Sequence, residues 1–344
     1  MSGAELPEDH MNVSGISVIM PVYNGCQFIV HSLPPLLDML HRGEINEMIV
    51  VDDGSTDDTV KTASGLGARV ISSGGRLGPG GARNKAASCA SGDILWFVDA
   101  DVIVHEDAAR RLVTGFREPD VVAVFGAYDD QPAAVNFLSQ YKNLVHHYYH
   151  REARREASTF WAGCGAVRRQ AFIDVGGFDI ERYRRPSIED IELGYRLREN
   201  GGRIVLLPEI KGTHLKVWRF ANLIYTEVFC RAIPWSRLML SRTGLVDDLN
   251  VGTLERVRAL LAMMFLLSIS AVVLLRVNPW LIVIMFIIVA AANVKLVKLF
   301  FRKKGWLFAV GGLLFHQLYY IYSSLAFAWC WLTYQWSRVR KQAA

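Results

Sequence analysis

The sequence is poor in cysteine, and no two cysteines stand in a spacing typical of a metal or redox motif. Its 344 residues include five cysteines, at positions 26, 89, 164, 230 and 330, and no C-x-x-C pair. This pattern argues against a zinc site and a disulfide framework, and it suits a reducing cytosol. The first fourteen residues also lack a basic start followed by an apolar core, so we expect no secretory signal and a cytoplasmic front domain.

Acidic residues are nearly absent from residue 251 onward. Residues 1–250 carry 27 basic and 32 acidic groups, whereas residues 251–344 carry 11 basic groups and one acid, Glu255. The net charge of +5 therefore combines an acidic front with a basic, apolar rear. An acidic front without a basic stripe argues against nucleic acid as a partner. Anionic lipid headgroups explain the basic rear better.

Charge is missing altogether from three apolar stretches. Residues 259–275, 280–294 and 306–336 contain 17, 15 and 31 residues without Lys, Arg, Asp or Glu. A membrane-spanning helix needs about 20 apolar residues, so we predict three transmembrane helices within residues 256–337. The basic tail, residues 338–344, then lies on the side that the positive-inside rule disfavours.

The chain is predicted to divide into five parts. A flexible tail, residues 1–14, precedes a front domain at residues 15–217, and residues 256–344 hold the three spans and the tail after them. Between them, residues 218–255 are expected to lie at the membrane surface. The apolar side of this segment consists of Phe220, Leu223, Ile224, Val228 and Phe229.

Short apolar, β-branched runs alternate with helix-like stretches in the front part. The runs are residues 15–21, 47–51, 68–71 and 94–98, and the helical stretches include 27–42 and 57–65. This alternation predicts an α/β fold with a mixed, mainly parallel sheet between helices. Further along we predict a helix over 141–156, a strand over 204–208, and a helix over 218–240 that Pro234 interrupts. Ligands of such sheets collect at the carboxyl ends of the strands.

Two adjacent acids, Asp52 and Asp53, end the second run. At a strand end their carboxylates can accept hydrogen bonds from a uracil or guanine N–H and from ribose hydroxyls, although Ser55-Thr56-Asp57 also suits the start of a helix. A glycine-rich turn at residues 74–81 then leads to Arg83, whose guanidinium fits a diphosphate. This turn does not match G-x-G-x-x-G after the first strand, which argues against a dehydrogenase.

Asp99 and Asp101 follow the fourth run and are two residues apart. In an extended segment, residues i and i+2 project to the same side, so both carboxylates can face one cation. Two anions held this close favour a divalent ion, and Mg or Mn suits oxygen ligands and phosphates. His214 is a candidate third ligand, with ordinary packing as its alternative.

Glu189 and Asp190 stand at a predicted helix start and are the candidate catalytic residues. A carboxylate there can act as a general base that deprotonates an acceptor hydroxyl, and the helix start would keep it ionised. The alternative is a capping box between Ser187 and Asp190. Nearby, Trp161, Gly163 and Cys164 combine aromatic surface with small residues, which suits either sugar stacking on the acceptor side or a packed turn.

These motifs together resemble those of family-2 glycosyltransferases with the GT-A fold, over roughly residues 15–215. The matching segments are 17–24, 51–57, 80–84, 99–101, 176–179 and 189–190. The resemblance implies an inverting, metal-dependent transferase in which Asp53 and its neighbour contact the nucleoside, Asp101 contacts the metal, and Asp190 is the base. It also implies that Pro21, Tyr23, Asn24 and Asp99 lie beside the nucleotide sugar.

Processive members such as cellulose and hyaluronan synthases carry Q-x-x-R-W ahead of their membrane helices. This chain has His-Leu-Lys-Val-Trp at residues 214–218, where Lys216 and Trp218 are assigned to the acceptor side, and it lacks the Gln and Arg. That departure disfavours polymer synthesis. Dolichol- and polyprenyl-phosphate sugar synthases also pair this fold with a few helices.

We therefore predict a multi-pass enzyme of the inner membrane, with its catalytic domain in the cytoplasm. It would transfer a sugar from a UDP- or GDP-sugar to a lipid-linked or polyprenyl-phosphate acceptor, with Mg or Mn as cofactor. A processive polysaccharide synthase and a non-catalytic membrane scaffold that binds nucleotide sugars are the alternatives.

Overall fold

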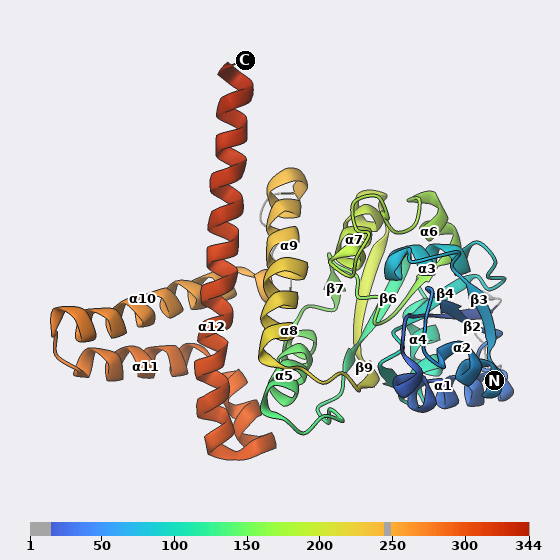
Figure 1. Ribbon diagram of the computed structural model, residues 1–344, viewed down its shortest axis with the longest axis horizontal. Coiled ribbons are helices and arrows are strands. Elements are labelled where there is room, and N and C mark those ends of the chain that lie inside the picture. The colour runs from blue at the N-terminus through green and yellow to red at the C-terminus, as the bar shows by residue number, and fades with distance from the viewer. Residues whose placement is uncertain (1–14, 244–248, 344) are drawn as a thin grey trace, which may run out of the picture.

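The computed structural model describes residues 15–243 and 249–343, so the predicted tail at residues 1–14 lies outside the described residues. A nine-stranded sheet with helices on both faces forms the front domain, and α9 stands between this domain and the long helix α12 (Figure 1). The strands are β1 Ile16–Val22, β2 Glu47–Asp52, β3 Arg69–Ser72, β4 Ile94–Val98, β5 Val102–Val104, β6 Val121–Tyr128, β7 Glu156–Ala157, β8 Cys164–Arg168 and β9 Arg203–His214.

The sheet is mixed, with the strand order β3-β2-β1-β4-β8-β6-β9-β5, and β7 pairs with β9. Four pairs are parallel, β1 with β2, β1 with β4, β2 with β3 and β6 with β9. The other four, β4 with β8, β5 with β9, β6 with β8 and β7 with β9, are antiparallel. The predicted mixed sheet is confirmed, and every antiparallel pair involves a strand that follows β4, where the alternation of strand and helix stops.

The front domain, residues 15–217, contains seven helices. They are α1 Cys26–His41, α2 Thr59–Gly65, α3 Gly78–Ala87, α4 Ala108–Gly115, α5 Phe137–Glu152, α6 Arg169–Asp174 and α7 Glu189–Glu199. The predicted helix at 141–156 is thus confirmed, shifted four residues toward the N-terminus as α5. The predicted strand at 204–208 is the middle of the longer β9.

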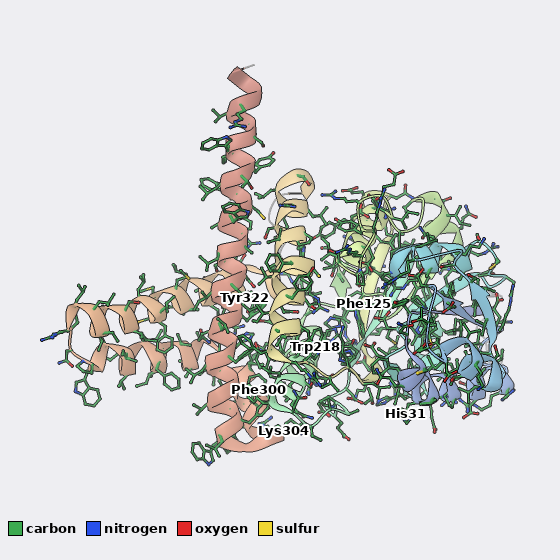
Figure 2. The ribbon with its side chains drawn as sticks, viewed as in Figure 1. His31, Phe125, Trp218, Phe300, Lys304 and Tyr322 are labelled. Carbon is green, nitrogen blue, oxygen red and sulfur yellow. The ribbon has the colours of Figure 1, made fainter. Side chains whose placement is uncertain are left out.

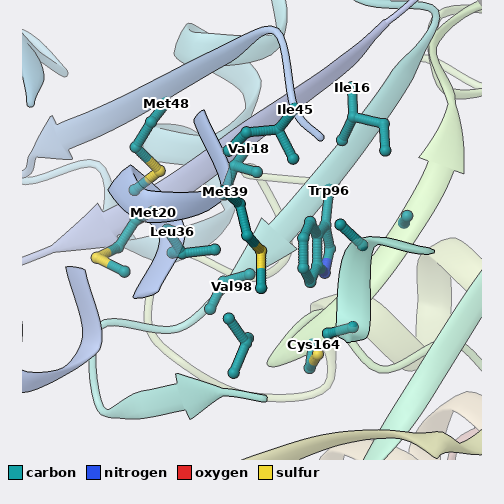
Figure 3. Packing of buried hydrophobic residues seen from close by; sticks show 14 of the residues in the cluster. Ile16, Val18, Met20, Leu36, Met39, Ile45, Met48, Trp96, Val98 and Cys164 are labelled. Atoms are coloured by element: carbon teal, nitrogen blue, oxygen red, sulfur yellow. The ribbon is translucent and has the colours of Figure 1, made fainter. Parts of the chain in front are cut away.

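Alternate residues of the central strands enter two separate cores. Val18 of β1 and Trp96 of β4 pack with Leu36 of α1 on one face of the sheet (Figure 3). Their neighbours Ile19 and Phe97 pack on the other face, in the cluster that also holds side chains of α3, α6 and α7. This follows from the two-residue period of a strand, and burial on both faces explains why β1 and β4 are almost wholly apolar.

After a linker at residues 215–219, the chain is helical over residues 220–243. This segment comprises α8 Phe220–Tyr225, the π-helix η1 Thr226–Ala232, α9 Ile233–Leu238 and the π-helix η2 Met239–Thr243, and a short 3-10 turn, η3 Leu249–Val251, follows. Pro234 does not interrupt it, contrary to prediction. Pro234 lies in the first turn of α9, where a missing N–H costs little.

The rear consists of α10 Thr253–Leu275, α11 Trp280–Ala292 and α12 Val294–Ala343, and α12 is broken at Gly305. In the described part of the chain only α10 is long and apolar enough to cross a membrane alone, and α11 with α12, bent by 84°, is a possible second span. The prediction of three separate membrane spans is therefore not confirmed. For α11 the reason is length: its 13 residues extend about 20 Å, less than the roughly 30 Å of a hydrocarbon core.

A buried polar network joins the front domain to these rear helices. The Glu255 carboxylate of α10 accepts hydrogen bonds from the hydroxyls of Tyr149 in α5 at 2.9 Å and Tyr320 in α12 at 2.6 Å. It also pairs with Arg258, which donates from Nε to the carbonyl of Ala292 at 2.9 Å. Buried charges are tolerated when they are paired and hydrogen-bonded in this way.

We expect Glu255→Ala to lower the melting temperature of the full chain in detergent, by an amount corresponding to about 3 kcal/mol or more, because Arg258 is left buried without its carboxylate. The control is Glu152→Ala, since Glu152 also joins α5 to α12 through Lys295, at 2.6 Å, but in an exposed ion pair. Such a pair is worth about 1 kcal/mol or less. Equal losses in the two variants would show that the network does not hold the rear helices.

Candidate active site

Three parallel strands bring the predicted acids to one edge of the sheet. In the register of β1 and β2, Val22 stands opposite Asp52, and β4 runs parallel to β1 on its other side. The segments that follow these strands, residues 23–25, 53–58 and 99–101, therefore meet at the carboxyl end of the sheet. This placement agrees with the sequence prediction.

Asp53 anchors the glycine-rich turn. Its Oδ1 accepts hydrogen bonds from the Ser73 hydroxyl at 2.8 Å and the Leu77 N–H at 2.9 Å, and its Oδ2 accepts one from the Gly78 N–H at 2.9 Å. Gly78 has φ +77°, and a Cβ there would lie 2.5 Å from the carbonyl oxygen of Arg184. The buried carboxylate thus fixes the loop that precedes α3, and its contact with a nucleoside stays a prediction.

Asn24, Asp52 and Tyr23 shape the same edge. The Asn24 side chain accepts a hydrogen bond from the Thr56 N–H at 2.8 Å, and the Asp52 carboxylate accepts one from the Ser55 N–H at 3.0 Å. The exposed Tyr23 ring lies 3.5 Å from the Arg76 guanidinium carbon, in cation–π contact. An aromatic ring, a guanidinium and a carboxylate therefore line this edge together.

Arg83 of α3 is buried between two predicted acids. Only 4% of its side chain is exposed, Nη2 donates to Asp99 Oδ1 at 2.6 Å, and Nη1 lies 3.6 Å from Glu189 Oε1. Nε and Nη1 have no hydrogen-bond partner among the described residues. A buried guanidinium with N–H groups to spare is suited to bind an additional anionic ligand.

The residue next to it, Asn84, fastens α3 to the loop before α7. Its amide donates to the Phe178 carbonyl at 2.8 Å and accepts from the Phe178 N–H at 2.9 Å. Gly177 has φ +68°, and a Cβ there would lie 2.7 Å from the Asn84 side chain. The motifs at 80–84 and 176–179 are thus one structural unit, and it holds Arg83 in place.

The predicted metal ligands lie near one another but are not already gathered around a point. His214 Nε2 is 3.6 Å from Asp101 Oδ2, and Asp99 is engaged by Arg83 through one of its two oxygens. Within residues 15–243 and 249–343 no cluster of three or more such side chains is placed to hold an ion. The donor types, two carboxylates and an imidazole, nevertheless suit Mg or Mn.

Glu189 and Asp190 begin α7 and face the same centre. Asp190 accepts hydrogen bonds from the Ile191 N–H at 2.8 Å and the Ala162 N–H at 3.2 Å, so its side chain is held toward β8 and not used in a capping box with Ser187. Burial raises the pKa of Asp190, and it raises the pKa of Glu189 to about 7. The expected effect of the helix start is therefore outweighed by desolvation.

Three residues of the predicted ligand-binding set are buried. Pro21 lies within β1, Cys164 is fully buried in β8 with its thiol pKa raised to about 12 by desolvation, and Trp218 is 2% exposed. Their contact with a ligand stays a prediction, and their burial argues against it. Figure 2 shows Trp218 between α8 and the sheet. A hydrophobic residue beside a motif is often there for packing, and sequence alone does not distinguish the two roles.

The remaining acceptor-side residues lie near the centre. Trp161 is partly exposed and covers Gly163, where a Cβ would lie 2.6 Å from the indole. The Gly163 carbonyl accepts a hydrogen bond from the Asp99 N–H at 3.1 Å. Tyr128, which sequence reasoning missed, stacks on His214 with centroids 4.3 Å apart and meets the Trp161 ring edge-on at 4.8 Å. In the sequence, the one sign of such a position is that Tyr128 ends the apolar run at residues 121–128.

Known proteins match the front domain. Residues 17–176 match glycosyl transferase family 2, and residues 142–217 match the N-terminal domain of galactosyltransferase. Glycosyltransferase GlyG of Streptococcus pneumoniae serotype 4 is 31% identical over 118 residues, which are 33% of this chain and 38% of that protein. O-antigen chain rhamnosyltransferase RfbN of Salmonella typhimurium is 28% identical over 238 residues, 64% of this chain and 74% of its own.

A solved structure of the mannosyltransferase PcManGT from Pyrobaculum calidifontis, in complex with GDP-Man and Mn²⁺, superposes with a TM-score of 0.51. It is 17% identical and covers 95% of this chain and 91% of its own. This likeness shows the fold, which is the GT-A fold that the sequence predicted.

The raised pKa of Glu189 predicts a pH-dependent stability. The folded protein holds this proton more tightly than the unfolded chain, so the contribution is present below a pH of about 4.5 and is lost as the pH rises through about 7. We expect Glu189→Gln to gain stability relative to the wild type between pH 5 and pH 8, by up to about 3 kcal/mol.

Melting temperatures of both proteins across this pH range would measure the effect. Glu181→Gln, at an exposed position in the preceding loop, serves as the control and should follow the wild type. Parallel curves for Glu189→Gln and the wild type would contradict the assignment.

Proposed function

From the premise that residues 17–176 form a glycosyl transferase family 2 domain, we propose that the protein transfers a sugar, with inversion, from a UDP- or GDP-sugar to a lipid-linked or polyprenyl-phosphate acceptor. The reaction takes place at the cytoplasmic face of the inner membrane. The apolar rear helices anchor the enzyme there.

The observation that carries this proposal is the convergence on Arg83. This one buried guanidinium contacts Asp99 at the end of β4 and approaches Glu189 at the start of α7, next to Asp190. Acids from segments 90 residues apart therefore surround one positive charge at the carboxyl edge of the sheet. A diphosphate and an acceptor oxygen need this combination of cation and carboxylate within reach of one carbon atom.

In this proposal the donor lies along the edge that Tyr23, Asn24, Asp52 and Asp53 form. Its nucleoside would contact the carboxylates, and Arg83 would bind the diphosphate with the N–H groups that have no partner among the described residues. Asp99, Asp101 and His214 would hold Mg or Mn, which would screen the diphosphate charge as it leaves. PcManGT, which shares the fold, was solved with GDP-Man and Mn²⁺.

In the reaction, an acceptor oxygen forms a bond to the anomeric carbon from the face opposite the diphosphate. The bond between that carbon and the diphosphate oxygen breaks, and the nucleoside diphosphate leaves with the electron pair. A hydroxyl acceptor gives its proton to Asp190, which the Ala162 and Ile191 N–H groups hold in position. An ionised phosphate acceptor has no proton to give.

The rear helices support a lipid acceptor. Leu274, Leu275 and Trp280, at the tip of the α10–α11 pair, are 76, 74 and 67% exposed. This pair projects away from the sheet (Figure 1). An apolar tip of this kind is costly in water and favourable in a bilayer.

The test incubates purified full-length protein with a panel of labelled nucleotide sugars, Mn²⁺ and a membrane lipid extract. We expect one donor to label a lipid, and we expect EDTA or Asp101→Asn to abolish the labelling. Failure of every donor to label any lipid would overturn the proposal. A labelled polymer would point to a processive synthase instead.

Asp190→Asn distinguishes the two kinds of acceptor. With a hydroxyl acceptor we expect the transfer rate to fall by about 10²-fold or more, because the general base is lost. With a phosphate acceptor the rate should be largely retained. Asp174→Asn, on the exposed end of α6, is the matched control, and a similar loss in it would show that the assay reports stability and not catalysis.

A further inference from the structure

Three cations lie near one another, on elements that carry no donor-binding motif. They are Lys142 of α5, Lys216 of the linker after β9, and Arg231 of η1, and they are called the basic cluster below. The Glu227 carboxylate of η1 accepts from Lys142 Nζ at 2.8 Å through one oxygen and from Arg231 Nη1 at 2.8 Å through the other. Lys216 Nζ lies 4.4 Å from the centre of the Trp218 ring.

Backbone contacts place this cluster next to the active site. The Leu215 N–H, adjacent to Lys216, donates to the Asp101 carbonyl at 2.9 Å. The Ser187 hydroxyl, just before Glu189 and Asp190, donates to the carbonyl of Cys230 at 2.9 Å, and Cys230 precedes Arg231. Lys216 therefore follows a residue that is hydrogen-bonded to Asp101, and Arg231 follows a residue that is hydrogen-bonded to the segment before Asp190.

The electrostatics agree with this placement. The Lys216 ammonium is near enough to Asp101 for its charge to act on that carboxylate. Burial raises the pKa of Asp190, and the charges of Arg83 and Arg231 oppose the rise. The basic cluster is thus close enough for its charge to act on both carboxylates.

The basic cluster contains three positive charges, and a single carboxylate, that of Glu227, pairs with them. Glu227 is its single acid, is itself buried, and uses both oxygens on Lys142 and Arg231. Lys142 is 16% exposed, and desolvation lowers its pKa to about 8. Two of the three positive charges are left without an acid inside the cluster, and the Arg231 side chain is 44% exposed, so an anion from outside can reach it.

We infer that Lys142, Lys216 and Arg231 bind the ionised phosphate of the lipid acceptor. The inference rests on the proposed function and names the group that recognises its substrate. The donor's diphosphate is assigned to Arg83 and the glycine-rich turn, whereas the basic cluster lies on α5, the 215–219 linker and η1. These elements lie between the sheet and the rear helices, where α9 and α12 stand side by side (Figure 1).

Exposed aromatic residues on the same segment fit the rest of such a substrate. Phe220, Tyr225 and Phe229 of α8 and η1 are 58, 54 and 58% exposed. A lipid phosphate would set its head between Lys216 and Arg231 and leave its chain along this apolar surface. The phosphate oxygen then reaches the centre already ionised, on the side where Asp190 stands.

The first test measures kinetics of the full-length enzyme with its donor and lipid acceptor. Arg231→Gln and Lys216→Gln are expected to raise the acceptor KM about 10-fold or more, since each removes a charged hydrogen bond, while the donor KM changes less than about 2-fold. Arg237→Gln, an exposed cation of α9 on the same helical segment, is the matched control. A rise in the donor KM instead would assign the cluster to the nucleotide and overturn the inference.

Glu227→Gln is expected to change the acceptor KM in the opposite direction, which loss of structure would not do. It removes the one acid of the cluster, so we expect a lower acceptor KM. An unchanged or higher KM in a variant with the wild-type melting temperature would contradict a role in binding phosphate.

A binding measurement separates failure of this inference from failure of the proposed function. Isothermal titration of the full-length protein in detergent would use dodecyl phosphate, dodecanol and inorganic phosphate, without any donor. We expect dodecyl phosphate to bind, Arg231→Gln to weaken it about 10-fold, and dodecanol not to bind. Inorganic phosphate binding as tightly as dodecyl phosphate, or equal binding of dodecyl phosphate and dodecanol, would overturn the lipid-phosphate assignment whether or not any sugar is transferred.

Discussion

The active-site region depends on one buried cation. Arg83 is held by Asp99 on one side and faces Glu189 on the other, and its own helix is fixed to the loop before α7 through Asn84. Removing Asp99 would leave the buried guanidinium without the carboxylate that pairs with it, which proteins tolerate poorly. The contacts that bring β4, α3 and α7 together therefore also position the groups proposed to react.

A second constraint is the attachment of the front domain to the rear helices. Glu255, the only acid beyond residue 250, accepts hydrogen bonds from tyrosines of α5 and α12 and pairs with Arg258. Helix α5 also donates from His147 Nδ1 to the Tyr128 carbonyl at 2.8 Å, if that nitrogen carries the proton, at the end of β6 beside the active site. A continuous set of polar contacts thus connects the apolar helices with the sheet and fixes the surface on which the basic cluster lies.

Much of the fold was predictable because strands and helices leave periodic signals. The predicted run at 94–98 coincides with β4, and Asp52 stands at the end of β2 as expected. The antiparallel pairs were not predictable, since they involve strands that follow β4, where the alternation of strand and helix no longer indicates which strands are neighbours. The π-helical stretches on either side of Pro234 were not predicted, because packing, and not local propensity, sets the course of the chain there. The helix predicted at 280–294 is present as α11, but its 13 residues are fewer than a membrane span needs.

The sequence by itself determined which residue types carry the chemistry: paired acids after strands, an arginine after a glycine-rich turn, and an apolar, basic rear. Their spacing along the chain was enough to name the family. Only the tertiary structure decided which of these side chains face one another. In the folded chain Pro21, Cys164 and Trp218 are buried, and the Asp53 carboxylate is hydrogen-bonded to the glycine-rich loop. Lys142, Lys216 and Arg231 come together from three separate elements. The physical reason is that burial and charge pairing depend on contacts between distant segments, which a linear order of residues does not contain.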